Sequence, residues 1–227
     1  MDISLFYQEK GTGEALILLH GNGEDSTYFK HQIEYFGDRY RVIALDTRGH
    51  GKSKRGSKEF TIKQFAKDLD RFMDSLGITQ AIILGFSDGA NIEMEFALKY
   101  PNKIKALILN AGNLNPKGVK WTIQIPIVVG YKIASWFSSK SKEAKKNTEM
   151  LGLMVLEPDI SPSELVKISV PTLVICGTRD MIKESHTKEI ARNIPNARLA
   201  IIKGNHFIAN KNHKAFNQEV ESFLQII

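Results

Sequence analysis

The sequence predicts an α/β fold with a mostly parallel, doubly wound sheet of about seven strands and helices on both of its faces. Short β-branched apolar runs alternate with longer amphipathic segments along the chain, which is the pattern of repeated strand–helix–strand units. Each run is almost continuously apolar, as a strand buried on both faces must be. Six runs meet these criteria: residues 15–19, 42–45, 81–84, 106–109, 172–176 and 199–202.

The first segment of the chain predicts a further strand. Residues 3–8 alternate apolar and polar side chains and lead into Gly11-Thr12-Gly13. We therefore expect an edge strand that forms a hairpin with the strand at 15–19.

Four segments have helical spacing. In residues 61–76 apolar side chains recur every three or four positions, and Gly77 follows as a plausible C-cap. Further helices are expected at 89–100, at 184–193, which Pro195 ends, and at 213–227.

Residues 113–169 separate two strands that a single helix would otherwise join. The segment is too long for a structureless loop, so we expect it to carry helices of its own. Because it follows a central strand, it would cover the carboxyl edge of the sheet, where open α/β sheets bind ligands. We interpret it as a small helical lid on a core formed by residues 1–112 and 170–227.

Composition restricts the class of protein. The 227 residues are 42% hydrophobic and 25% charged, as in a globular chain rather than a disordered one. The single cysteine, Cys176, lies in an apolar run and is expected to be a buried structural thiol. The charge of +6 is too diffuse to indicate a nucleic-acid partner. With neither a signal-peptide pattern nor a long apolar span, we expect a cytoplasmic protein without stable membrane association, either monomeric or a homodimer.

The strongest chemical signal is Gly85-Phe86-Ser87-Asp88-Gly89, between the strand at 81–84 and the following helix. A G-x-S-x-G sequence at a strand–turn–helix junction holds its serine on a strained turn, with the hydroxyl exposed. The helix N-terminus favours negative charge developing there. The pattern predicts Ser87 as a nucleophile; the alternative is an ordinary glycine-rich turn with a capping serine.

A serine nucleophile needs a base and a third group that orients the base. Asp180 follows the next-to-last strand in Gly177-Thr178-Arg179-Asp180, and His206 follows the last strand. This gives the order serine, acid, histidine that accompanies G-x-S-x-G turns. Parallel strands end at one edge, so the three side chains should meet there. We expect the other histidines to be surface, capping or loop-holding residues: His20, His31, His50, His186 and His213.

An oxyanion hole needs two backbone N–H donors. We expect one from Asp88, which follows the nucleophile, and one from Asn22 in the loop His20-Gly21-Asn22-Gly23. The glycine-rich loop at 46–53 lacks the glycine spacing of a phosphate-binding loop, so nucleotide binding is not predicted.

Five motifs together resemble those of the α/β-hydrolase family, almost from end to end of the chain: HGNG (20–23), DTRGHGKS (46–53), GFSDG (85–89), GTRD (177–180) and GNH (204–206). The resemblance implies a Ser87–His206–Asp180 triad that works through a covalent acyl-enzyme, with no metal or organic cofactor. The GFSDG sequence is most similar to small carboxylesterases and the biphenyl-hydrolase-like group. Serine at position 87 disfavours the similar dehalogenases and epoxide hydrolases, which use aspartate there. The chain departs from the family in lacking the first strand of the usual sheet.

The leading hypothesis is a serine hydrolase of small carboxylic esters. Apolar lid side chains would contact the substrate's acyl or aryl group: Trp121, Ile125, Trp136 and Phe137. Carbon–carbon, lactone, amide, thioester and perhydrolase chemistry remain open, because fold and triad do not determine the substrate.

Two hypotheses from other classes remain. The chain could be a ligand receptor that keeps the pocket without turnover. A lipid-surface role would rest on the lysines of residues 140–146 beside the apolar lid.

Overall fold

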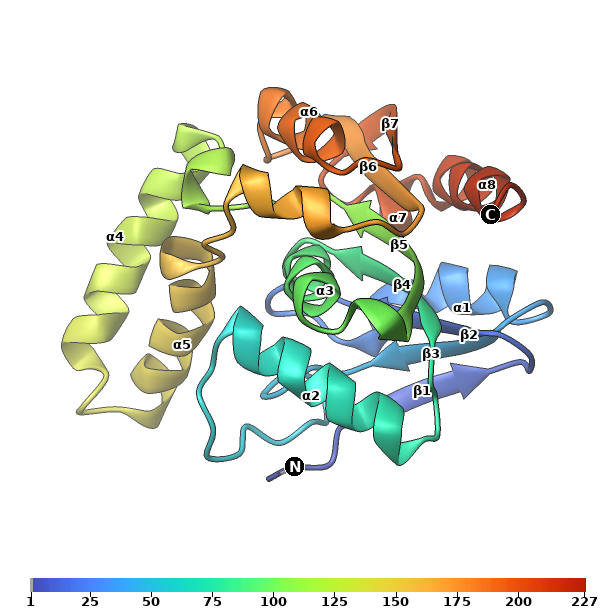
Figure 1. The fold of residues 1–227 in the computed structure, drawn as a ribbon. Coiled ribbons are helices and arrows are strands. Elements are labelled where there is room, and N and C mark those ends of the chain that lie inside the picture. The colour runs from blue at the N-terminus through green and yellow to red at the C-terminus, as the bar shows by residue number, and fades with distance from the viewer. Residues whose placement is uncertain (1) are drawn as a thin grey trace.

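The computed structural model describes residues 2–227, and its sheet has the strand order β1-β3-β2-β4-β5-β6-β7 (Figure 1). Only the β1–β3 pair is antiparallel among the pairs in residues 2–227. The predicted α/β fold with a mostly parallel sheet is therefore confirmed. The strands are β1 (Tyr7–Lys10), β2 (Ala15–Leu19), β3 (Arg41–Leu45), β4 (Ala81–Phe86), β5 (Ile104–Asn110), β6 (Thr172–Arg179) and β7 (Ala197–Asn205).

The prediction for the first strand was wrong in its bounds and in its partner. The strand β1 begins at Tyr7 rather than Ile3, and it pairs with β3, where Tyr7 faces Leu45. A hairpin with β2 is impossible because β2 already pairs with β3 on one side and β4 on the other. The chain therefore crosses to the open edge of β3.

Successive side chains of the central strands point to opposite faces of the sheet and enter two separate cores. In β2, Leu16 and Leu18 join one core, while Ile17 and Leu19 join the other. All five residues of β2 are buried. This explains why the sequence of the strand is continuously apolar rather than alternating.

Helices cover both faces of the sheet. One core includes side chains of α1 (Lys30–Phe36), α7 (Ile208–Lys211) and α8 (His213–Leu224), together with the 3₁₀ turn Ser26–Phe29. The other includes side chains of α2 (Ile62–Ser75), α3 (Asp88–Lys99) and α6 (Glu184–Asn193). The predicted helices at 61–76, 89–100, 184–193 and 213–227 are confirmed to within a few residues.

The helix α2 illustrates how the sequence sets these boundaries. Thr61 has extended backbone dihedrals, and its hydroxyl accepts a hydrogen bond from the Gln64 backbone N–H. This N-cap satisfies a donor that has no partner within the helix. Gly77, with φ of +65°, allows the chain to leave the helix in the left-handed region.

Residues 113–169 contain the helices α4 (Trp121–Phe137) and α5 (Lys142–Leu156), which lie side by side at one end of the molecule (Figure 1). Two 3₁₀ turns, Pro116–Gly118 and Pro162–Lys167, flank this helical hairpin. The apolar residues that follow Pro126 do not form a separate helix, because α4 runs through the proline. No helix within residues 2–227 has both the length and the apolar character required to cross a bilayer.

Loose packing distinguishes this helical hairpin from the rest of the protein. Leu153 is the one buried residue of α5, and α4 has none. The base of the hairpin is attached to the loop after β6, where the Lys120 N–H donates to the Met181 carbonyl at 2.9 Å and Val119 forms a bridge with Ile182. This attachment brings the helical hairpin to the carboxyl edge of the sheet.

Candidate active site

Ser87 lies on a sharp turn between β4 and α3. Its backbone has φ of 54° and ψ of −115°, and a positive φ is costly for a residue with a side chain. The hydroxyl makes no capping bond to α3, so the alternative of a simple capping serine does not describe it. The turn therefore presents the hydroxyl away from its own helix.

Two glycines permit this turn by allowing backbones to approach closely. A Cβ at Gly85 would lie 2.3 Å from the Gly89 carbonyl carbon, and a Cβ at Gly89 would lie 2.0 Å from the Leu19 carbonyl oxygen. Both distances are far below van der Waals contact. The two glycines of the motif are thus required by packing, independently of any reaction.

The structure brings Ser87, His206 and Asp180 into one hydrogen-bonded chain. His206 Nε2 lies 3.1 Å from Ser87 Oγ, and His206 Nδ1 lies 2.7 Å from Asp180 Oδ1. A carboxylate can only accept, so the imidazole proton resides on Nδ1 and Nε2 is left to accept from the serine hydroxyl. This is the relationship between nucleophile, base and orienting acid that acyl transfer uses.

Asp180 is buried and fixed by its neighbours. Its Oδ1 also accepts from the Ile182 N–H at 2.9 Å, and its backbone carbonyl accepts from Lys120 Nζ at 2.6 Å. The imidazole of His206 is equally buried and lies against Phe86, with ring centroids 4.9 Å apart. Both partners of the pair are therefore held in one orientation before any substrate arrives.

The loop at 20–23 lies directly against Ser87. A Cβ at Gly21 would lie 3.2 Å from Ser87 Cβ. Within residues 2–227, the backbone N–H groups of Asn22 and Asp88 donate to no other protein group. These two N–H groups, one directly after Ser87 in the chain and one directly after Gly21, therefore remain available to a ligand.

His20 holds this loop in place. Its Nδ1 lies 2.7 Å from the Gly21 carbonyl, and its Nε2 accepts from the Thr47 N–H at 3.0 Å. Burial lowers the pKa of His20, which favours the neutral ring that this pattern needs. The hydrogen bonds agree with the loop-holding role expected from the sequence.

The neighbouring loop at 46–53 is also held by internal contacts. Asp46 accepts from the backbone N–H groups of Ser26 and Lys52, at 2.7 and 2.8 Å. The fully buried Arg48 forms ion pairs with Asp68 and Asp2, each at 2.7 Å. These contacts satisfy the polar groups of the loop within the protein, which gives the loop a structural role.

Sequence reasoning missed two buried carboxyl groups near Ser87, those of Asp88 and Glu93. Asp88 accepts from Asn91 Nδ2 at 3.3 Å through one oxygen, while the other has no partner within the described residues. Burial raises the pKa of Asp88 to about 6, and the negative charge of Glu157 adds to the effect.

The second carboxyl group is that of Glu93. It accepts a hydrogen bond from the Gly85 N–H at 2.7 Å, and burial raises the pKa of Glu93 also. Glu93 lies four positions after Gly89, on the inward face of α3, which is the signal that could have revealed it.

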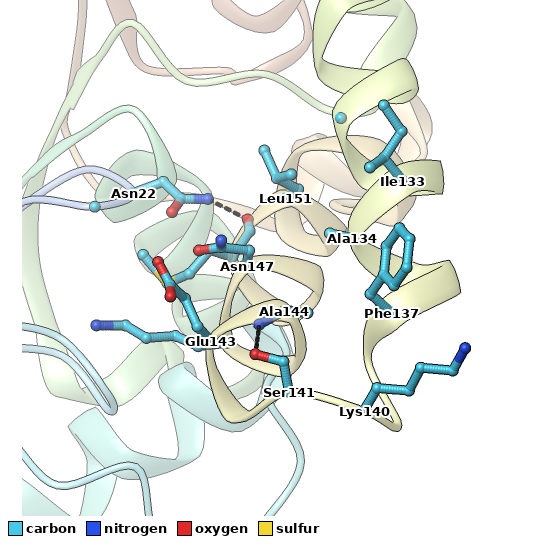
Figure 2. Close-up of a pocket in the computed structure, with 14 residues that line it drawn as sticks. Asn22, Ile133, Ala134, Phe137, Lys140, Ser141, Glu143, Ala144, Asn147 and Leu151 are labelled. Carbon is cyan, nitrogen blue, oxygen red and sulfur yellow. Dashed lines mark hydrogen bonds between the residues drawn. The ribbon is translucent and has the colours of Figure 1, made fainter.

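An open groove of about 820 Å³ runs between α4 and α5 and reaches the loop at 20–23, where Asn22 and Gly23 line it. The Asn22 side chain donates to the Met150 carbonyl at 2.7 Å and so joins this loop to α5 (Figure 2). The sequence carried no sign of this link. Apolar side chains from both helices line the groove: Ile133, Ala134, Phe137, Ala144, Met150 and Leu151.

Of the lid side chains expected to contact substrate, only Phe137 lines this groove. Trp121, Ile125 and Trp136 are more than half exposed and are not among the residues that line it. The groove lies against one side of α4, and these three residues occupy another side of the helix.

Comparison with known proteins identifies the class. The family profile described as the alpha/beta hydrolase fold matches residues 14–132, so the chain belongs to the α/β-hydrolase family. The resemblance drawn from the five motifs is confirmed.

Relatives of several activities share this fold. The chain is 26% identical to 3-oxoadipate enol-lactonase 2 of Acinetobacter baylyi, over 99% of this chain and 94% of the relative. It is 28% identical to the serine hydrolase BPHL of Mus musculus, over 98% and 84% of the two chains. A thermophilic esterase from Thermogutta terrifontis superposes with a TM-score of 0.80 at 25% identity, covering 98% of this chain and 93% of the esterase. These names support a hydrolase and leave the bond that is cleaved open.

Proposed function

We propose that this protein is a serine hydrolase that cleaves small carboxylic esters through a triad of Ser87, His206 and Asp180. The observation that carries the proposal is the continuous chain of hydrogen bonds, 3.1 Å and 2.7 Å long, that ends on a serine with strained backbone. Strain of this kind persists only where the surrounding structure enforces it, and it is concentrated at functional sites.

The geometry supports acylation by general base catalysis. His206 Nε2 removes the hydroxyl proton as Ser87 Oγ attacks the ester carbonyl, and Asp180 stabilises the imidazolium that forms. The backbone N–H groups of Asn22 and Asp88 donate to the negative oxygen of the tetrahedral intermediate. The imidazolium then protonates the departing alkoxide, which leaves an acyl group on Ser87.

Deacylation repeats these steps with water as the nucleophile. His206 accepts a proton from water as it attacks the acyl carbonyl, and then returns that proton to Ser87 Oγ as the acid is released. The cycle consumes one ester and one water and requires no group other than those of the chain.

The groove between α4 and α5 is the proposed site for the acyl group. It reaches Asn22, a proposed oxyanion donor, and its apolar side chains would contact the hydrocarbon part of an acyl chain. Lys140, Glu143 and Lys146 line the groove as well. A volume of about 820 Å³ is in the range of pockets for small organic ligands.

Burst kinetics with p-nitrophenyl esters of increasing acyl length would test this function. We expect a rapid release of one p-nitrophenol per protein and an intact mass increased by the acyl group. Lactones belong in the same panel, because one relative is named as an enol-lactonase. A folded protein that releases product from no ester and acquires no acyl mass would refute the proposal.

A further inference from the structure

The outward face of α4 is apolar where a water-facing helix is normally polar. Lys132 is the only charged residue in the 17 residues of α4, and the helix has no buried residue. Four large apolar side chains on this face are more than half exposed. They are spaced four and seven positions apart, so they share one side of the helix: Trp121, Ile125, Val129 and Trp136.

The end of the hairpin is basic. The turn from α4 to α5 and the first turn of α5 hold Lys140, Lys142, Lys145 and Lys146, with Glu143 as the one acid among residues 138–148. All four lysines are exposed. None of them forms a salt bridge within residues 2–227. Lys140 follows α4 and lies over the Phe137 ring, whereas Lys142, Lys145 and Lys146 lie on the side of α5 that faces Arg55 and Phe60. The uncompensated positive charges therefore gather at the end of the hairpin rather than along the apolar face.

This combination of charge and apolar surface indicates what covers the face. An apolar helix face with basic residues beside it is the pattern of helices that lie in the interface of an anionic membrane. Both tryptophans of the chain lie on the face, 69% and 78% exposed, and tryptophan favours the membrane interface. A two-fold interface would bring this face against itself, so a second copy of the chain is the alternative occupant that the test must distinguish.

We propose that the outer face of α4, with the lysines of the hairpin end, docks this protein reversibly on an anionic lipid surface. Docking would replace the sequence-based expectation of no stable membrane association. The groove borders the same helix, so apolar esters dissolved in the lipid would meet the hairpin first. The proposal does not depend on turnover, since it involves none of the triad residues.

Tryptophan fluorescence provides a direct readout, because Trp121 and Trp136 are the only tryptophans. We expect their emission to shift to shorter wavelength with phosphatidylglycerol vesicles, and the protein to float with these vesicles in a density gradient. Pure phosphatidylcholine vesicles should give a much weaker response. Measuring Ser87→Ala in parallel prevents hydrolysis of lipid and should give the same binding, which separates docking from the proposed activity.

Two variant pairs locate the surface. Val129→Glu places a charge in the apolar face and should abolish flotation, while Val166→Glu, at a valine that is 62% exposed elsewhere, should not. Lys142→Gln with Lys145→Gln should weaken binding by about 30-fold, since each lysine near the surface contributes about 1 kcal/mol. The control, Lys203→Gln with Lys214→Gln, makes the same change in net charge. Turnover of a water-soluble ester should be unchanged in Val129→Glu.

Two outcomes would overturn the proposal. One is the absence of both flotation and a spectral shift with anionic vesicles. The other is a blue shift that appears without vesicles as protein concentration rises, with a dimer in sedimentation that Val129→Glu dissociates. In that case a second copy of the chain covers the face.

Discussion

The turn at Ser87 is tightly packed, whereas the helical hairpin of α4 and α5 is loosely packed. Around Ser87, backbones approach so closely that a single methyl group would not fit at Gly85 or Gly89. In the lid, α4 buries no residue, and a Cβ at Gly152 of α5 would meet nothing closer than 3.6 Å. The difference implies that substitutions on the surface of the hairpin should disturb the proposed triad less than substitutions at the turn.

The largest expected effect tests the core. Ser87→Ala should lower kcat by about 10⁴-fold or more, because removing the nucleophile of a triad removes most of the rate enhancement. The far-ultraviolet circular dichroism and the melting temperature should be those of the wild type. Steady-state kinetics with a p-nitrophenyl ester measure the change. Turnover near the wild-type rate would show that Ser87 is not the nucleophile.

Two helical glycines compare the regions directly. Gly89→Ala in α3 should destabilise the fold by about 3 kcal/mol or more, because the new methyl group would overlap the Leu19 carbonyl. Gly152→Ala in α5 should be neutral or stabilising by up to about 1 kcal/mol, since alanine favours a helix. Urea unfolding of both variants measures these changes. Equal losses in the two variants would contradict the proposed difference in packing.

A pH series examines the buried carboxyl of Asp88. Its pKa in the folded protein is raised from 3.8 to about 6, so the native state binds more protons than the unfolded chain across that interval. Stability therefore decreases as pH rises from about 4 to 6 and does not recover above it. Asp88→Asn removes this titration. The free energy of unfolding of the variant minus that of the wild type should therefore increase by roughly 2 to 3 kcal/mol from about pH 4 to pH 7. A difference between the variant and the wild type that stays constant across this pH range would refute the assignment.

The smallest effect distinguishes the two sides of α4. Phe137→Ala, in the groove, should raise KM several-fold for long-chain esters and leave acetate esters almost unchanged, because lost apolar contact costs about 1 kcal/mol or more. Trp136→Ala, on the outer face, should leave both KM values unchanged for soluble esters. If Trp136→Ala raised KM and Phe137→Ala did not, substrate would bind on the other side of α4.

Local pattern was sufficient to predict most of the core. Strands such as Ala15–Leu19 could be predicted because burial on both faces demands a continuous apolar run. The partner of β1 could not, because it depends on which edge remains free once the parallel strands have assembled. Nothing in residues 3–8 carries that information.

The site likewise contains residues that could be predicted from the sequence and residues that could not. Ser87, Asp180 and His206 could be selected because parallel strands end at one edge, whatever the packing between them. The direction of the α4 side chains could not be predicted, since every face of the helix is rich in apolar residues. Only the position of α5 shows that Phe137 lines the groove and Trp136 does not.

Intact mass after incubation with a fluorophosphonate tests the central claim, an activated Ser87, most directly. The account predicts one adduct on the wild type, one on Ser141→Ala, whose serine borders the groove, and none on Ser87→Ala. Labelling of Ser87→Ala, or a folded wild type that remains unlabelled, would contradict it.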